Sequence, residues 1–115
     1  MRLEGVAKRL PERYNVSHLQ SLFFSVDLLE KNGPLLKFPH SSEVKSSRHG
    51  AMRELRSQCK GNPLRTFYVF DPRRTGVLLI GGDKTGNDRF YGEMVPKADK
   101  IYDEYLKEIQ EENNG

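Results

Sequence analysis

Basic side chains that could hold phosphate are concentrated in one part of the chain, residues 45–91. That stretch carries ten Lys and Arg against four Asp and Glu, a net charge of +6, and the rest of the chain carries nine basic and twelve acidic residues, a net charge of −3. The overall charge of +3 therefore hides a strongly basic segment beside acidic ones. Such asymmetry indicates a polyanionic partner for one surface.

Arg56 and Arg65 lie near the middles of neighbouring strand-like runs, where we expect both to be exposed on the sheet. The planar guanidinium fork can bind a phosphate through two hydrogen bonds and does not lose its charge. Two such groups on one sheet face could hold adjacent phosphates of an RNA strand. The alternative is that they form surface ion pairs with Glu54 and Asp71, which would contribute little to stability.

Lys84 follows two glycines and an aspartate at the end of a strand-like run, in the loop GGDKTG. Glycines at such a place permit close backbone approach. The loop lacks the G-x-x-x-x-G-K-[ST] spacing, which excludes a nucleotide-binding P-loop. Lys84 could still contact a phosphate or stabilise a transition state. The alternative is a solvated loop lysine.

His49 and Tyr91 flank the strand-like runs and could move protons. Histidine titrates near neutral pH, and a tyrosine can serve if neighbouring cations lower its pKa. Alternatively, His49 is an exposed loop residue and Tyr91 a core aromatic. No G-x-S-x-G elbow is present, so nucleophilic hydrolysis has no support. The candidate metal ligands are His18, His40, His49 and Cys59, and they do not have the spacing of a metal site. We therefore expect no metal.

Length and composition predict a single domain over residues 1–115. A hydrophobic content of 36% and a charged content of 30% suit a soluble globule with a thin core. No run approaches the roughly 18 apolar residues that span a membrane, and the N-terminus has no apolar region typical of a signal peptide. The single Cys59 cannot form an internal disulfide. Together these features favour the cytoplasm.

The sequence predicts two helices, one before and one after the strand-like runs. The first follows Ser17, a suitable N-cap residue, and ends at Gly33-Pro34. Its apolar stripe comprises Leu19, Leu22, Phe23, Val26 and Leu29 (or Leu28). The second runs from about 88 to 111, with a stripe of Met94, Val95, Ala98, Ile101, Tyr102, Tyr105 and Ile109. Residues 1–14 are ambiguous, and residues 35–50 indicate an exposed loop.

Three strand-like runs lie between the helices, at about 51–58, 63–70 and 75–82. The short turns between them favour an antiparallel meander. Strand alternation places Met52, Glu54 and Arg56 on one face and Arg53 and Leu55 on the other. The third run, GVLLIGG, is nearly all apolar, which predicts a central strand or one covered on both faces.

Four segments together resemble the phage-derived HigB-like toxins of the RelE/ParE superfamily, over about residues 25–110. They are SVDLLEKNGP, VKSSRHGAMRELR, GNPLRTFYVFDPRRTGVLLIGGDKTGNDRFY and MVPKADKIYDEYL. The resemblance implies an α+β fold in which a small curved antiparallel sheet packs against an N-terminal and a C-terminal helix. It also implies the toxin of a type II toxin-antitoxin system, a metal-independent endoribonuclease that cuts translated mRNA and uses no cofactor.

The same resemblance implies partners and a site. The partners are mRNA, on the ribosome, and a cognate helix-turn-helix antitoxin. Carried over by motif, the catalytic positions are Arg56, Arg65, Lys84 and Tyr91. Further basic side chains of the central segment are predicted to bind RNA, and they are Lys45, Arg48, His49, Arg53, Arg73, Arg74 and Arg89.

Residues 1–24 depart from the family pattern, in which a first β-strand usually joins the sheet. RLEGVAKRLPERYN has no alternating apolar run, so we expect no strand there. The sheet would then keep an open edge, which favours a homodimer or strand addition by the antitoxin. Three other functions stay open: a catalytically inactive protein that retains antitoxin binding, a ParE-like gyrase inhibitor, and a generic nucleic-acid-binding domain.

Overall fold

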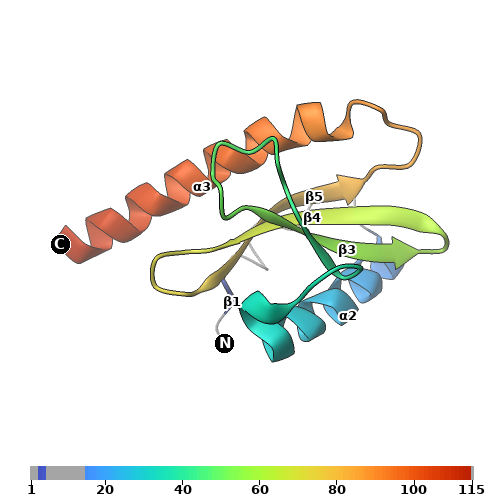
Figure 1. Cartoon of the computed structure of the whole chain (residues 1–115), viewed down its shortest axis with the longest axis horizontal. Coiled ribbons are helices and arrows are strands. Elements are labelled where there is room, and N and C mark those ends of the chain that lie inside the picture. Colours follow the sequence, from blue (N-terminus) through green and yellow to red (C-terminus); the bar gives the residue numbers. More distant parts are fainter. Residues whose placement is uncertain (1–2, 5–14, 115) are drawn as a thin grey trace.

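The computed structural model describes residues 3–4 and 15–114 (Figure 1). Two helices, α2 (Val16–Asn32) and α3 (Phe90–Asn114), pack on opposite faces of one five-stranded sheet (Figure 1). This arrangement confirms the predicted α+β class. No helix among the described residues is both long and apolar enough to cross a membrane.

The centre of the sheet is the predicted meander of β3 (Arg53–Cys59), β4 (Asn62–Phe70) and β5 (Gly76–Asp83). The strands are antiparallel, and the sheet order is β1-β5-β4-β3-β2, which makes β4 the middle strand. In the register between β3 and β4, Arg56 lies opposite Arg65. The sequence therefore predicted these three strands, with boundaries that differ only slightly.

The two outer strands were not predicted. β1 (Leu3–Glu4) pairs in parallel with β5 at Gly76 and Val77, so the expectation of no strand at the N-terminus is wrong for these two residues. Residues 5–14, also covered by that expectation, lie outside the described part of the chain. Since β1 covers this part of β5, the open edge expected there is partly closed.

The stretch expected to be an exposed loop, residues 35–50, contains the end of a short 3-10 helix, η1 (Gly33–Leu35), and the strand β2 (Ser41–Glu43). β2 pairs with residues 53–55 of β3. Ser-Ser-Glu has no apolar alternation, so β2 depends on long-range contacts. One of them is the hydrogen bond of 2.6 Å between the hydroxyl groups of Ser41 and Tyr68.

The N-cap of helix α2 lies two residues before the predicted one. Asn15, not Ser17, is the N-cap residue: its side-chain oxygen accepts from the His18 backbone N–H at 2.9 Å. The His18 ring nitrogen Nδ1 accepts in return from the Asn15 N–H at 3.2 Å. Asn caps about as well as Ser, and here the reciprocal bond decides the position. The helix ends at Gly33, where φ is 54°, as predicted.

The two sheet faces hold separate apolar clusters. Between α2 and the sheet, the buried residues are Leu22, Val26, Leu29, Leu36, Leu55, Tyr68 and Leu78. The opposite cluster, beneath α3, includes Met52, Phe67, Val69, Val77, Leu79, Phe90, Val95, Ala98 and Tyr102. Leu78 faces one cluster while its neighbours face the other, which confirms that β5 is covered on both sides. Phe23, expected in the buried stripe of α2, is instead 47% exposed.

Candidate functional site

Strand alternation brings Glu54, Arg56 and Arg65 together on the face of the sheet that α3 covers. Glu54 and Arg56 are two residues apart on β3, and Arg65 lies across from Arg56 on β4. The guanidinium nitrogen Nη1 of Arg56 is 3.2 Å from Oε1 of Glu54. The Arg65 nitrogen Nε is 3.7 Å from the same oxygen, an ion pair that is too long to be a good hydrogen bond.

One carboxylate oxygen is the centre of this site. Besides the Arg56 contact, Oε1 of Glu54 accepts a hydrogen bond of 2.9 Å from the Ser42 hydroxyl and one of 3.0 Å from the Tyr91 phenol. The Glu54 side chain is only 4% exposed. We call these residues, with Lys84, the Glu54 cluster: Ser42, Glu54, Arg56, Arg65, Lys84 and Tyr91.

Lys84 joins the cluster through Tyr91. Its backbone N–H donates to the Pro63 carbonyl at 3.0 Å, and its Nζ lies 5.4 Å from the centre of the Tyr91 ring, above the ring face. Tyr91 is the second residue of α3, and its ring packs edge-on against Phe67. The four residues predicted to be catalytic, Arg56, Arg65, Lys84 and Tyr91, are thus neighbours.

The loop glycines have the role that the sequence indicated. Gly81 lies directly beside the backbone of β4, where an added Cβ would come within 2.7 Å of the Arg65 carbonyl oxygen. Real Cβ atoms do not come so close to backbone, so any other residue would push β5 away from β4. Gly81 therefore allows the close strand packing that places Arg65 in the cluster.

Arg65 differs from the expectation for an exposed arginine, because its side chain is only 4% exposed. It lies on the middle strand of the sheet, and its Nη1 donates to the Leu64 carbonyl at 2.9 Å. Arg56 is 26% exposed and lies on a strand whose edge is partly open. The proposed alternative partner Asp71 does not take part: it accepts hydrogen bonds from Arg73, Thr75 and Tyr105 instead.

Glu54 as the centre of the site was missed by the sequence reasoning, which considered it only as a partner in surface ion pairs. The available signal was its position, two residues before Arg56 on a strand that alternates between two covered faces. A glutamate at such a place is buried unless the face is open, and buried carboxylates need cationic partners.

The cluster has unused hydrogen-bonding capacity and excess positive charge. Among the described residues, Oε2 of Glu54 and Nε of Arg65 are buried without a hydrogen-bond partner. Two cations, Arg56 and Arg65, pair with the single Glu54 carboxylate, and a third, Lys84, lies over the ring of Tyr91. Buried polar groups are usually satisfied, and unbalanced positive charge attracts anions. The arrangement is therefore suited to receive one further anionic group, such as a phosphate.

Tyr91 is set up to donate a proton. Burial raises the pKa of its phenol, the hydrogen bond and charge of Glu54 raise it further, and the nearby Arg65 lowers it in part. The net direction is upward, so the condition named from the sequence, a pKa of Tyr91 lowered by neighbouring cations, is not met. A phenol with a raised pKa keeps its proton at neutral pH and serves as an acid rather than as a base.

His49 belongs to a different network. Its Nε2 is 2.8 Å from Oδ1 of Asp103 on α3, and its ring packs edge-on against Tyr102 with centroids 4.8 Å apart. Arg48 forms ion pairs with Asp99 and Asp103 of the same helix. These contacts attach the loop between β2 and β3 to α3 and leave His49 in a structural setting.

The other predicted RNA-binding residues lie on several different elements. Arg53 lies on the α2 side, where its Nε donates to the Ser41 hydroxyl at 2.9 Å. Arg73 lies at the turn between β4 and β5 and contacts Asp71, Tyr105 and Glu112. The exposed residues of the set are Lys45, Arg48, Arg73, Arg74 and Arg89. The described residues contain no group of three or more side chains that could hold a metal ion.

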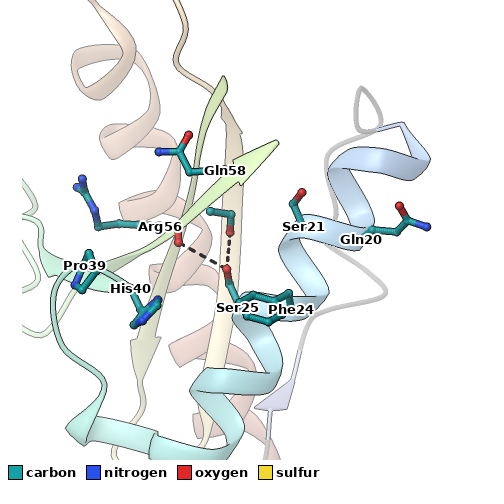
Figure 2. A pocket seen from close by; sticks show the side chains of 9 residues that line it. Gln20, Ser21, Phe24, Ser25, Pro39, His40, Arg56 and Gln58 are labelled. Atoms are coloured by element: carbon teal, nitrogen blue, oxygen red, sulfur yellow. Dashed lines mark hydrogen bonds between the residues drawn. The ribbon is translucent and has the colours of Figure 1, made fainter. Parts of the chain in front are cut away.

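A groove of about 550 Å³ opens between α2 and the edge of β3, beside Arg56 (Figure 2). It is lined by Gln20, Ser21, Phe24, Ser25, Pro39, His40, Arg56, Ser57 and Gln58. Figure 2 shows the Ser25 hydroxyl pointing at β3, where it bonds the Ser57 hydroxyl at 2.7 Å. At this edge β2 pairs with residues 53–55 of β3, and the Arg56 N–H donates to the His40 carbonyl at 2.8 Å, so the groove lies beside the strand end that follows Arg56. The guanidinium of Arg56 lies 5.0 Å from the centre of the exposed Phe38 ring.

Comparison with known proteins identifies the family. A family model described as phage-derived protein Gp49-like matches residues 8–103. The protein named "Putative toxin HigB3" of Mycobacterium tuberculosis is 39% identical over 93 residues, which are 80% of this chain and 80% of that protein. "Putative toxin HigB2" of the same organism is 34% identical over 92 residues, 78% of this chain but only 46% of that protein, so the chain spans about half of its length. No solved structure is significantly similar. The chain belongs to the phage-derived Gp49-like family.

Proposed function

We propose that the chain is the toxin of a type II toxin-antitoxin system and that it cuts translated mRNA without a metal ion. Two relatives that carry the name of toxins cover most of the chain. The observation that supports the catalytic part is the Glu54 cluster, in which two arginines and a tyrosine contact one carboxylate and a lysine lies over the ring of that tyrosine. The partner in this proposal is a cognate antitoxin with a helix-turn-helix, and the second partner is mRNA on the ribosome.

The proposed reaction uses the 2′-hydroxyl of the RNA as its own nucleophile. That oxygen gives its proton to solvent water and attacks the adjacent phosphorus, which leaves a 2′,3′-cyclic phosphate. The bond from phosphorus to the 5′-oxygen of the next nucleotide breaks, and that oxygen takes a proton and leaves as a hydroxyl group. Arg56 would contact the phosphoryl oxygens. Arg65, which is buried in the sheet, would stabilise the negative charge that the phosphoryl group gains in the transition state. Such preorganised cationic stabilisation is usually the largest single contribution to catalysis.

Tyr91 and Lys84 complete this division of roles. Tyr91 is protonated at neutral pH, so it can give a proton to the departing 5′-oxygen, and Lys84, above the Tyr91 ring, adds positive charge at that side. His49, considered as the alternative proton carrier, is bonded to Asp103 outside the cluster, so we assign the role to Tyr91.

The test is inducible expression in a bacterial host, with northern analysis of several abundant mRNAs. We expect the parent chain to shorten translated transcripts, and Arg56→Ala to leave them intact. The matched control is Lys31→Ala, which removes a cation from α2 that forms an ion pair with Asp27 at 2.9 Å, away from the Glu54 cluster. Intact transcripts at full expression of the folded parent would contradict the endoribonuclease proposal.

A second candidate function is a binding protein that keeps the antitoxin contact but does not cut RNA. The observation that favours it is the contact of both arginines with the chain's own carboxylate. Growth arrest with intact mRNA but damaged DNA would instead indicate the gyrase-inhibitor alternative. Co-purification with an antitoxin in the absence of both effects would indicate the binding protein.

A further inference from the structure

We infer that Glu54 is a positioning residue, an internal counter-anion that holds Arg56 and Tyr91 in place and yields Arg56 to the substrate phosphate. The inference rests on the proposed function, since it assigns a role within that site. It does not make Glu54 a catalytic residue, because the carboxylate acts through the groups bonded to it.

The contacts of Glu54 converge from four elements. Ser42 reaches it from β2, Arg56 from its own strand β3, Arg65 from β4 and Tyr91 from α3. All four approach the single oxygen Oε1. A carboxylate with this set of neighbours fixes the relative positions of a phosphate-binding cation and a proton donor before any substrate arrives. Preorganisation of this kind is what a reaction based on positioning requires.

The two arginines differ in their freedom to leave Glu54. The Arg65 side chain is 4% exposed and bonded to the Leu64 carbonyl, so its position is fixed. The Arg56 side chain is 26% exposed and rests over the exposed ring of Phe38, a contact that tolerates movement. Arg56 is therefore the cation that can exchange the Glu54 carboxylate for a phosphate, while Arg65 keeps Glu54 from being left as an unpaired buried charge.

The same carboxylate sets the state of Tyr91. The charged groups around the phenol are Glu54, to which it donates, Arg65 and Arg56 on the sheet, and Lys84 above the ring. Glu54 raises the pKa of Tyr91, and Arg65 opposes it. Removing the negative charge of Glu54 while keeping Arg65 should therefore lower the pKa of Tyr91. This gives a readout that is independent of RNA cleavage.

The experiment compares Glu54→Gln with the parent by three measurements. The first is an absorbance titration of tyrosine ionisation, with Tyr91→Phe used to identify the Tyr91 contribution. The second is the affinity for a DNA oligonucleotide, which lacks the 2′-hydroxyl and cannot be cut. The third is the rate of cleavage of the matching RNA. Ser42→Ala is the control, because it removes one hydrogen bond to the same oxygen and leaves every charge in place.

For Glu54→Gln we expect ionisation of Tyr91 at lower pH and about tenfold tighter binding of the DNA, since one charge-assisted bond no longer competes. Cleavage should fall by about 10²-fold, because Arg56 and Tyr91 lose their fixed positions. Tighter DNA binding together with slower RNA cleavage would show that Glu54 positions the other groups. Loss of a residue with only a structural role would instead lower both the DNA affinity and the cleavage rate. Ser42→Ala should leave the Tyr91 titration unchanged.

An unchanged Tyr91 titration together with unchanged DNA affinity in Glu54→Gln would overturn the inference. If that variant does not fold, Glu54→Asp decides: its shorter carboxylate keeps the charge but draws back from Tyr91, so ionisation should again occur at lower pH, and no change would overturn the inference. Failure of the parent to cut RNA would contradict the proposed function alone, because the titration and the DNA affinity still test Glu54.

Discussion

Glu54 and Arg65 are charged side chains in the interior of a small protein, each 4% exposed. Taking such groups out of water is unfavourable, and their mutual attraction offsets that cost only when the partners are in place. The separation of 3.7 Å between Arg65 Nε and Glu54 Oε1, with Arg65 Nε and Glu54 Oε2 left without hydrogen bonds, shows a pair that is held together but not optimised for stability. Such a compromise is typical of functional sites.

The difference in burial predicts different effects for the two arginines. Arg65→Ala should lower the free energy of unfolding by about 3 kcal/mol, because it removes one partner of a buried pair. Arg56→Ala should cost under about 1 kcal/mol, since its ion pair is partly exposed. Urea unfolding followed by circular dichroism measures both. Equal and small losses would restore the view, drawn from the sequence, that both arginines lie on the surface.

At the scale of the elements, the cap of α2 gives a direct comparison of two neighbouring residues. Asn15→Ala should lower the free energy of unfolding by about 1 kcal/mol, because the His18 N–H loses its acceptor. Ser17→Ala should have little effect, since Ser17 lies inside the helix. Thermal melting of the two variants checks this, and a larger loss for Ser17→Ala would contradict the assigned helix start.

The turn between β4 and β5 predicts a loss of stability in acid. Burial alone would raise the pKa of Asp71, but hydrogen bonds from Tyr105, Thr75 and Arg73 and the charge of Arg73 together lower it. A carboxyl group with a lowered folded pKa stabilises the fold above its unfolded pKa of about 3.9, and this stabilisation is lost as the pH falls through the folded value. Unfolding free energies measured from pH 6 to 2 should therefore decline below about pH 4, and the decline should be smaller in Asp71→Asn.

The meander could be predicted from the sequence because its signals are local. Turn residues such as Asp71-Pro72 and the apolar run of β5 lie within a few positions of what they specify. The strand β2 and the burial of Arg65 could not be predicted, because both depend on partners distant in the sequence. Ser41–Glu43 form a strand by pairing with β3, and Arg65 is buried because β4 is the middle strand of the sheet. The four predicted catalytic residues were placed together by motif, but their common carboxylate needed the sheet register.

At the scale of the whole molecule, the basic residues divide between a cluster on one face and separate contacts elsewhere. Arg53 is on the opposite face, Arg48 is paired with α3, and Arg65 is buried, so the cations of the Glu54 cluster that can reach a phosphate directly are Arg56 and Lys84. With Arg56 and Lys84 as the two contacts, each contributing about −0.7, the slope of log K against log salt should be about −1.4. Binding of a single-stranded oligonucleotide at several salt concentrations measures it. A flat response would exclude phosphate contacts at this site.

Cys59, 5% exposed at the end of β3, gives the unmodified chain its own reporter of motion. Because the thiol is buried, a thiol reagent reaches it when this end of β3 separates from β4 or from α2. When reclosing is fast, the labelling rate gives the free energy of that opening. Arg56 lies three residues earlier on the same strand. If opening of the strand releases a ligand bound to Arg56, that ligand would slow the labelling of Cys59 in proportion to its occupancy. Binding of an uncut oligonucleotide could thus be followed from a single sulfur atom.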